Sequence, residues 1–397
     1  MMSRFSATVF AASVLTQPAP ANALEITASL KADAVVRLGT ETDRSQAVLA
    51  DVSLGLEAEH ITQDGWRLGA VASLRAQHDS ARRGFARQAG DCPPALADCP
   101  STHGRGLSGA LTGLHAVGGL DADTGRGEVE AAYLFVRAPR FELRLGRGPG
   151  AAAIEAEPLP GAFRLMRADA GLVDPEGFAL ASTANTLSTN SAKIVVQSRR
   201  LLGFRASASY TPQAQSCGVD VCRPETGAAG PVFAEVENVL EGALSFDHRF
   251  RSSGQRWTAS LAASAGEAGG PFAAGFEDPW AASARVIWSR GALSAGLGAL
   301  VSNDGVEDGD YRALSASLAW ERGPWLTALE WAGADSDLVH AQGWTLQLGS
   351  SRLFENGAVA GVGLRHGEET VPAVHGVQRA SDTRSASTLF VEAGLRF

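Results

Sequence analysis

The residues of this chain that could act on a solute are carboxylates gathered in one irregular segment. Residues 148–190 carry five acids, which are Glu155, Glu157, Asp169, Asp174 and Glu176. No strand or helix period is sustained there, and a connection of that length is usually either disordered or functional. Its large apolar residues are too numerous for a disordered linker; they include Leu159, Phe163, Leu165, Met166, Leu172, Val173 and Phe178. We therefore expect a long loop that packs against another part of the protein and presents carboxylates there, although Asp174 precedes Pro175 and could simply start a turn.

No catalytic motif accompanies these acids. The sequence has neither Gly-x-Ser-x-Gly nor His-Glu-x-x-His, which mark two common classes of hydrolase. Its eight histidines are scattered, and the run from Gly146 to Gly150 is too weak a pattern for a phosphate-binding loop. We predict that the protein is not an enzyme and needs no cofactor, and calcium bound at the acidic loops stays open.

The four cysteines fall into two local pairs. Cys92 and Cys99 lie in one turn-rich segment, and Cys217 and Cys222 lie in another. Each pair is close enough to form a disulfide across a small loop, as exported proteins do. Zinc, which takes close cysteine spacings together with histidine partners, is the weaker alternative.

Composition and the first residues indicate export. A net charge of −9 and a pI near 5.5 argue against a nucleic-acid partner. Arg4, the apolar run from Phe5 to Leu15 and the small residues Ala21-Asn22-Ala23 are typical of a secretory signal. We predict a signal peptide over 1–23 and a mature chain from Leu24, with a buried N-terminal strand as the alternative. No apolar run reaches the 18 residues of a membrane-spanning helix.

The elements that must position the acidic segment are strands, because apolar and polar residues alternate along most of the mature chain. From Leu24 to Leu38, for example, Leu30 and Val36 share one face and Asp33 the other. Sixteen such runs are predicted, over 24–38, 48–60, 66–77, 129–135, 141–147, 193–197, 204–210, 237–250, 255–267, 280–289, 292–302, 311–321, 325–331, 342–352, 358–366 and 387–397.

The connections between these runs alternate in length. They are short after every even strand and generally longer after the odd ones. An even number of antiparallel strands with short turns at one end and long loops at the other is the pattern of a transmembrane β-barrel. A soluble sandwich or propeller has no reason to sort its connections in this way.

Tryptophans and the last strand support the barrel. The eight tryptophans fall near strand ends on the apolar face, as expected for aromatic girdles at two membrane–water interfaces; they are Trp66, Trp257, Trp280, Trp288, Trp320, Trp325, Trp331 and Trp344. The final run alternates up to Phe397 and could close the barrel against the first strand, which leaves no free edge in the membrane.

The chain resembles the general porins of Gram-negative outer membranes, particularly their alphaproteobacterial branch. The resemblance rests on the run Glu130-Ala131-Ala132-Tyr133-Leu134-Phe135, on the run from Phe141 to Arg147 with its Leu-x-Leu-Gly-Arg, and on Phe397. Strand count and loop order extend it over nearly all the mature chain. Pro139-Arg140 departs from the family's glycine-rich turn, and the long cysteine-bearing loop after His78 departs in length.

This resemblance implies a homotrimer of sixteen-stranded all-β barrels in the outer membrane, each a water-filled channel for passive diffusion of small hydrophilic solutes and ions. The third outer loop, here 148–190, would fold inward so that Glu155, Glu157, Asp169 and Asp174 face a basic wall across the narrowest section. Phe397 would be the signal for the barrel-assembly machinery, and membrane lipid and lipopolysaccharide would be partners.

The strand register supplies candidates for the basic wall. Eight basic residues share the face that does not meet lipid; they are Lys31, Arg37, Arg67, Arg75, Arg144, Lys193, Arg205 and Arg285. We predict that Lys31, Arg37, Arg75, Arg144 and Arg205 line the pore, whereas Arg67 near a strand end would pair with an acid at the rim. Opposed rows of acid and base would set up a transverse field that favours polar solutes.

A second class of function stays open. The long outer loops with their two cysteine pairs would also suit a substrate-specific channel, or a barrel that serves as a receptor or adhesin. A sugar channel would carry aromatic residues along its lumen, yet every tryptophan here is predicted to face lipid.

Overall fold

The computed structural model describes residues 24–38, 48–79, 107–115, 125–174, 180–214, 232–375 and 378–397. The predicted signal peptide, 1–23, and all four cysteines, Cys92, Cys99, Cys217 and Cys222, lie outside the described residues. The signal peptide and the two local disulfides therefore stay predictions.

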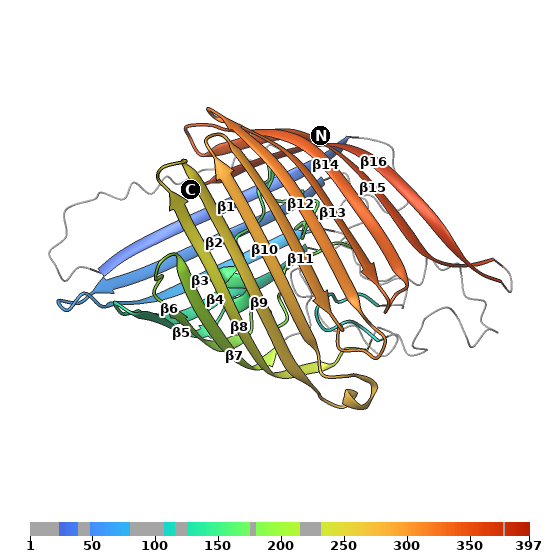
Figure 1. Cartoon of the computed structure of the whole chain (residues 1–397), viewed down its shortest axis with the longest axis horizontal. Helices are drawn as coiled ribbons and strands as arrows, with labels where there is room; N and C mark the ends of the chain where they lie inside the picture. The colour runs from blue at the N-terminus through green and yellow to red at the C-terminus, as the bar shows by residue number, and fades with distance from the viewer. Residues whose placement is uncertain are drawn as a thin grey trace, which may run out of the picture.

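Sixteen strands make up almost all of the regular structure (Figure 1). They are β1 (Leu24–Leu38), β2 (Val48–Ile61), β3 (Arg67–His78), β4 (Gly125–Arg137), β5 (Phe141–Arg147), β6 (Ala192–Ser198), β7 (Phe204–Ala214), β8 (Glu235–Phe250), β9 (Gln255–Gly269), β10 (Trp280–Arg290), β11 (Leu293–Ser302), β12 (Tyr311–Arg322), β13 (Trp325–Ser336), β14 (Ala341–Leu353), β15 (Ala358–His375) and β16 (Gln378–Arg396). Among the described residues, no helix is long and apolar enough to span a membrane.

Each strand pairs antiparallel with its neighbours in sequence, and β1 pairs with β16 to close the barrel. The closing seam runs from the pair Lys31–Arg396 to the pair Leu38–Leu389. It is extended by two backbone hydrogen bonds of 2.9 Å between Leu30 and Phe397. The predicted fold, a closed sixteen-stranded antiparallel barrel, is confirmed.

Side chains alternate between the two faces of the wall as the sequence predicts. In β12, Leu314 and Leu318 are exposed on the outer face while Ser315 and Ser317 are buried on the inner face. The outer face carries large apolar residues all round the barrel, which suits contact with lipid hydrocarbon. The inner face carries most of the charged and hydroxyl groups, because such groups are costly against lipid.

The largest departure from the predicted boundaries is at the last hairpin. β15 continues to His375 and β16 begins at Gln378, so both strands extend well past the predicted 358–366 and 387–397. Only two residues separate β15 from β16, and β13 likewise extends to Ser336, four residues before β14. These last two connections at the long-loop end are therefore as short as the turns at the other end. The sorting of connections by length therefore holds as far as the β11–β12 connection and is lost in the last two.

One described piece of the β3–β4 connection, residues 107–115, packs against other connections at the same end. All nine residues are buried. Leu107 bridges to Val232 of the β7–β8 connection, and the amides of Leu111 and Thr112 donate to Asp304 of the β11–β12 connection at 2.8 and 3.0 Å. An apolar cluster surrounds this contact and draws on further connections; it includes Leu107, Leu111, Leu114, Leu180, Leu187, Val306, Leu338 and Val371.

Candidate functional site

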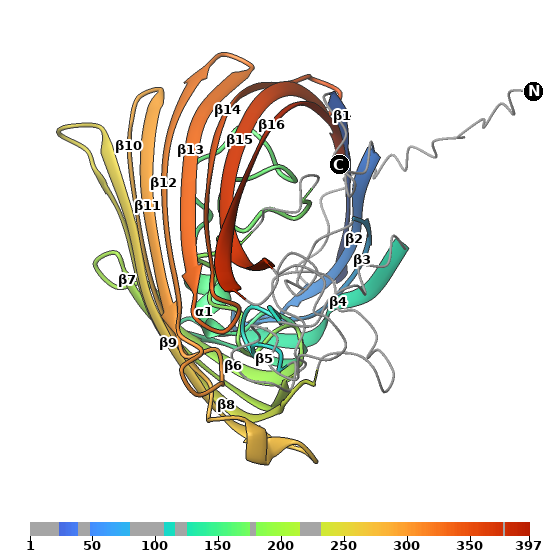
Figure 2. The ribbon, with the colours of Figure 1, turned by 90° about the vertical axis from the view of Figure 1, so that its right-hand side faces the viewer.

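The segment between β5 and β6, residues 148–191, begins with one short helix, α1 (Ala151–Glu155), and is otherwise irregular in its described part. Figure 2 shows α1 and the green trace after it within the ring formed by the strands. Polar side chains from β1, β2, β7, β10, β13, β14 and β16 contact the segment. These strands lie all round the barrel, so the segment contacts wall positions on opposite sides of it.

Glu155, at the end of α1, is the first anchor. Its carboxylate accepts a hydrogen bond of 2.7 Å from Gln197 and further hydrogen bonds from Ser207 and Ser245. Arg205 Nε lies 2.9 Å from the same carboxylate. Burial acts to raise the pKa of Glu155, but these hydrogen bonds and Arg205 outweigh it and lower the pKa below its ordinary value. Glu155 is therefore an ionised group that fixes the segment to β6, β7 and β8.

Arg164 is the anchor on the opposite side of the barrel. Its guanidinium forms ion pairs with Asp33 of β1 and with Asp51 of β2, the latter at 2.5 Å. Arg75 of β3 also binds Asp51, at 2.6 Å. The two wall carboxylates are almost completely buried, so their charges are balanced by the arginines that touch them.

The backbone next to Arg164 captures a third wall carboxylate. The consecutive amides of Arg164, Leu165 and Met166 all donate to Glu392 of β16, at 2.8 to 3.2 Å. Gln347 of β14 donates to the carbonyl of Met166 at 2.8 Å. Successive amides that converge on one anion form a favourable concave site, and here the anion belongs to the protein's own wall.

Apolar packing accompanies these polar contacts. The ring of Phe163 lies 4.9 Å from that of Phe390, edge to face. A Cβ atom added at Gly349 would collide with the Phe163 ring, and one added at Gly363 would collide with the Phe390 ring and crowd that of Phe163. These two wall glycines therefore provide the space that the two rings occupy. The buried cluster around them includes Val35, Leu49, Phe163, Leu165, Met166, Val173 and Phe390.

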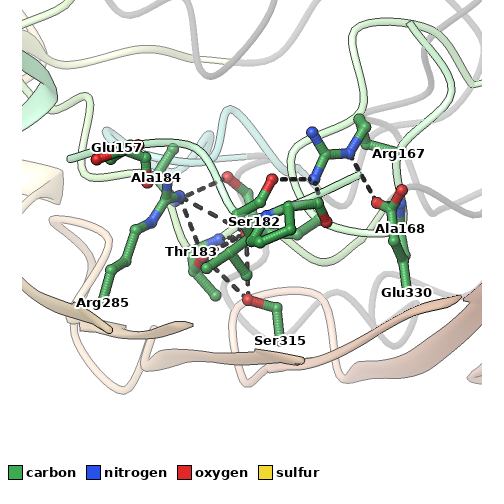
Figure 3. A network of polar contacts seen from close by, with 12 residues as sticks. Glu157, Arg167, Ala168, Ser182, Thr183, Ala184, Arg285, Ser315 and Glu330 are labelled. Atoms are coloured by element: carbon green, nitrogen blue, oxygen red, sulfur yellow. Dashed lines mark hydrogen bonds and ion pairs between the residues drawn. The ribbon is translucent and has the colours of Figure 1, made fainter. Parts of the chain in front are cut away.

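A second arginine of the segment contacts β13. Arg167 Nε donates to Glu330 at 2.7 Å, and its Nη2 donates to the carbonyl of Leu159 at 2.7 Å. Figure 3 shows Arg167 turned towards Glu330. This ion pair fixes the turn of the segment between 159 and 168 against the wall.

Asp169 lies in a polar network with the returning part of the segment. It accepts hydrogen bonds from the amide and hydroxyl of Thr183, at 2.7 and 2.5 Å, and from Ser315 of β12 at 3.2 Å. Arg285 of β10 lies 3.6 Å from Asp169 and donates to Thr183 at 3.1 Å. Figure 3 shows Arg285 and Ser315 reaching Thr183 from the wall.

Lys193 links the two ends of the segment. This buried side chain donates to the carbonyl of Gly148 at 2.7 Å and to the carbonyl and hydroxyl of Ser188 at 3.1 and 3.0 Å. It also donates to the carbonyl of Thr189. An ammonium group surrounded by oxygens holds the start and the end of the segment close together.

The predicted acids of the segment are thus mostly bound to wall groups. Glu155 and Asp169 contact Arg205 and Arg285, but they lie directly against the wall and do not face it across open water. Asp174 is also buried, and its amide donates to Asp79 at 3.2 Å. Only Glu157 of these four keeps a large exposed fraction, 42%, while lying 3.7 Å from Arg256.

The predicted basic residues are distributed differently from the expectation of one open row. Arg75 and Arg205 are engaged as described above, and Arg144 binds Glu142 at 2.7 Å. Arg37 is buried and Lys31 is exposed on the inner face of β1. Among the other basic positions, Arg67 pairs with Glu59 at 3.2 Å near the turn end, as its place near a strand end predicts; Lys193 and Arg285 bind the segment.

The tryptophans lie mainly on the outer surface. Those exposed by more than a third are Trp66, Trp257, Trp280, Trp320, Trp325 and Trp331, and the half-buried ones are Trp288 and Trp344. Trp288 pairs directly with Trp257 across β9 and β10. Their role as membrane-interface girdles stays a prediction, as does the role of Phe397 in assembly.

Sequence reasoning missed the residues that bind the segment from the wall, together with both arginines that meet them. These residues are Asp33, Asp51, Glu330, Glu392, Arg164 and Arg167. The available signal was that all four acids lie on the inner face of strands, where a buried carboxylate needs a partner. Within the part of the chain described, no group of three or more His, Cys, Asp or Glu residues could hold a metal ion.

Comparison with known proteins agrees with this architecture. A family model described as Gram-negative porin matches residues 6–368. No curated protein matches the chain. The solved structure of OmpT, an outer membrane protein of Vibrio cholerae in a trimer form, is similar with a TM-score of 0.53 at 11% identity, covering 95% of this chain and 100% of that one. The anion-selective porin from Comamonas acidovorans is similar with a TM-score of 0.50 at 13% identity, covering 94% and 99%.

Identities this low show a shared fold, whereas the family match extends over nearly the whole chain. Together with the closed barrel and its apolar outer face, the match establishes that the chain belongs to the Gram-negative porin family and is an outer-membrane channel protein.

Proposed function

We propose that the protein is a passive diffusion porin in which residues 148–190 fold inward and narrow a water-filled pore. The observation that carries the proposal is the set of contacts from this one segment to strands on opposite sides of the barrel, at Arg205 of β7 and at Asp33 of β1. A polypeptide held across the interior reduces the open section, and the polar inner face lets hydrated solutes pass beside it.

The proposal includes the surroundings of the channel. The similar Vibrio cholerae protein is described in a trimer form, and we propose a homotrimer here as well. Outer-membrane lipid, lipopolysaccharide and the barrel-assembly machinery are the proposed partners. A barrel whose interior is occupied by structural ion pairs suits transport of small polar solutes better than catalysis, so we propose no enzymatic activity.

Conductance in planar bilayers tests the proposal. The reconstituted protein should give stepwise current increments that grow with salt concentration. Glu157→Cys places a thiol at the exposed acid of the segment, and a bulky thiol reagent should then reduce the conductance. Arg312→Cys is the control, because Arg312 is exposed on the outer face of β12. Silent insertion, or equal block of both variants, would contradict the proposal.

Solute uptake separates a general pore from a substrate-specific one. Liposomes that contain the protein should swell at rates set by solute size alone. Saturation by one solute would instead support the substrate-specific alternative.

A further inference from the structure

The ion pairs that hold the 148–190 segment to the wall are unequally exposed. In the pair between Arg205 and Glu155, 29% of the arginine side chain is exposed but 0% of the glutamate. Glu155 is enclosed by hydroxyl and amide groups of the wall. The positive member of the pair therefore meets the water of the lumen, and the negative member does not.

The same asymmetry recurs at the two other arginine anchors. Arg164 is 19% exposed, against 1% for Asp33 and 0% for Asp51. Arg167 is 15% exposed, against 3% for Glu330. Glu392, which binds backbone amides of the segment, is 2% exposed. Each anchor is consequently a dipole with its positive end towards the pore.

Ion pairs elsewhere on the inner face are of two kinds. Some share the asymmetry: Arg384 is 36% exposed against 1% for Glu369, and Arg147 is 27% exposed against 9% for Glu128. Others are balanced. Arg144 and Glu142 are each 18% exposed, and Arg256 and Glu157 are 44% and 42% exposed. Near the turn end, three arginines meet three glutamates in one network, formed by Arg67, Arg137, Arg144, Glu57, Glu59 and Glu142. The pairs away from the segment are thus either balanced or also have their positive member towards the water, so none of them opposes the anchors.

We infer that the pore prefers small inorganic anions to cations of similar size, because the segment presents guanidinium groups to the water and conceals their carboxylate partners. A passing ion approaches the exposed nitrogen atoms closely, while the carboxylates stay behind them. An ion that is nearer to the positive end of a dipole is attracted if it is an anion and repelled if it is a cation. Lys31, exposed on the inner face, acts in the same direction. This inference rests on the proposed function, since selectivity requires an open channel.

The sign of the preference also differs from what an acidic segment alone would give. Residues 148–190 contain five acids and only two basic residues. A cation preference would follow if those acids faced the pore. The structure places Glu155 and Asp169 against the wall and leaves Arg164 and Arg167 partly in water. Burial, and not the number of charges, therefore sets the sign.

Reversal potential under a potassium chloride gradient tests the inference. A unit charge about 7 Å from a passing ion changes its local concentration by roughly 1.5- to 3-fold once water and dilute salt are taken into account. We therefore expect a chloride-to-potassium permeability ratio of at least about 2 in dilute salt, decreasing as salt is raised. A ratio at or below one would overturn the inference and leave the porin function intact. A protein that does not conduct would overturn both.

A double substitution separates hidden charges from exposed ones. Arg205→Gln with Glu155→Gln removes one charge of each sign, so the formal charge of the lumen is unchanged. Because only the arginine is exposed, the permeability ratio should fall by roughly 1.5- to 3-fold. The matched control is Arg144→Gln with Glu142→Gln, where both side chains are equally exposed and the ratio should not change. Equal effects of the two double variants on the permeability ratio, or no effect of either, would contradict the inference. If a variant fails to assemble, the reversal potential of the wild type still tests the anion preference.

Discussion

Replacing Arg164 should release the 148–190 segment from one side of the barrel. Arg164 forms ion pairs with Asp33 and Asp51, while Arg75 provides Asp51 with a second partner. Asp33 has no other ion pair within the described residues, so Arg164→Gln leaves a buried carboxylate without its balancing charge.

The size of the effect follows from that uncompensated charge. Removing one partner of a buried ion pair costs about 3 to 5 kcal/mol. Because Arg164 is 19% exposed, the lower end applies. A loss of about 3 kcal/mol changes the ratio of docked to undocked segment by roughly 150-fold. The barrel strands themselves keep all of their backbone hydrogen bonds, so the loss concerns the segment and not the wall.

Two measurements report on the segment. Thermolysin, which cleaves at large apolar residues, should cut the variant near Phe163 and Leu165, which are buried in the wild type. Single-channel recordings should show a larger and noisier conductance. Arg312→Gln is the control, since that exposed arginine pairs with Asp310 on the outer face and should have no effect. If the variant resists thermolysin and conducts as the wild type does, Arg164 does not hold the segment.

Three further predictions concern other contacts. Gly349→Val should displace the Phe163 ring at a cost of roughly 1–3 kcal/mol and raise the conductance. Gly242→Val is the control, because no neighbouring atom lies within 4 Å of a Cβ at that position, and it should leave the conductance unchanged. Unchanged conductance in the first variant would refute the packing role of Gly349. Burial raises the pKa of Asp304 against the opposing effect of the hydrogen bonds from Thr112 and Leu111, so docking of residues 107–115 should strengthen as pH falls through that raised pKa and weaken as pH rises through it. Amide exchange at Leu111 and Thr112, corrected for intrinsic rates, should show this dependence in the wild type and lose it in Asp304→Asn. Mass spectrometry of unreduced peptides should find Cys92 linked to Cys99 and Cys217 linked to Cys222; free thiols or crossed pairs would disprove the local disulfides.

Strand positions could be predicted from the sequence because lipid and water impose opposite demands on the two faces. β5 begins at Phe141 and ends at Arg147 in both the prediction and the structure. The extension of β15 and β16 was not predicted, because the alternation of apolar and polar residues is imposed only where hydrocarbon lies against one face of a strand. Beyond the predicted end at His366, the sequence of β15 loses its alternation at Glu368-Glu369-Thr370, as expected where no hydrocarbon lies against one face.

The site was predicted less completely than the barrel. The length and composition of 148–190 identified the segment that contacts strands on opposite sides of the barrel, and register placed Arg205 and Arg285 on the inner face. The pairing of individual charges was not predictable, because Arg164 and its partner Asp33 lie 131 residues apart in the sequence, with strands β2 to β5 between them. The exposure of each member of a pair depends on that three-dimensional placement, so the acids of the segment were expected in water and lie against the wall.

The hydrogen-bonded seam between β1 and β16 has a consequence for how the barrel forms. Every other strand pair joins neighbours in sequence and can form locally. The seam instead pairs Leu30 with Phe397, which are separated by nearly the entire chain. Pairing over such a separation is slow because a very large loop must close first. Until then the edges of β1 and of the last strand formed are open to other chains. Folding yield should therefore decline as protein concentration rises. Aggregation competes with barrel closure for as long as the sheet stays open.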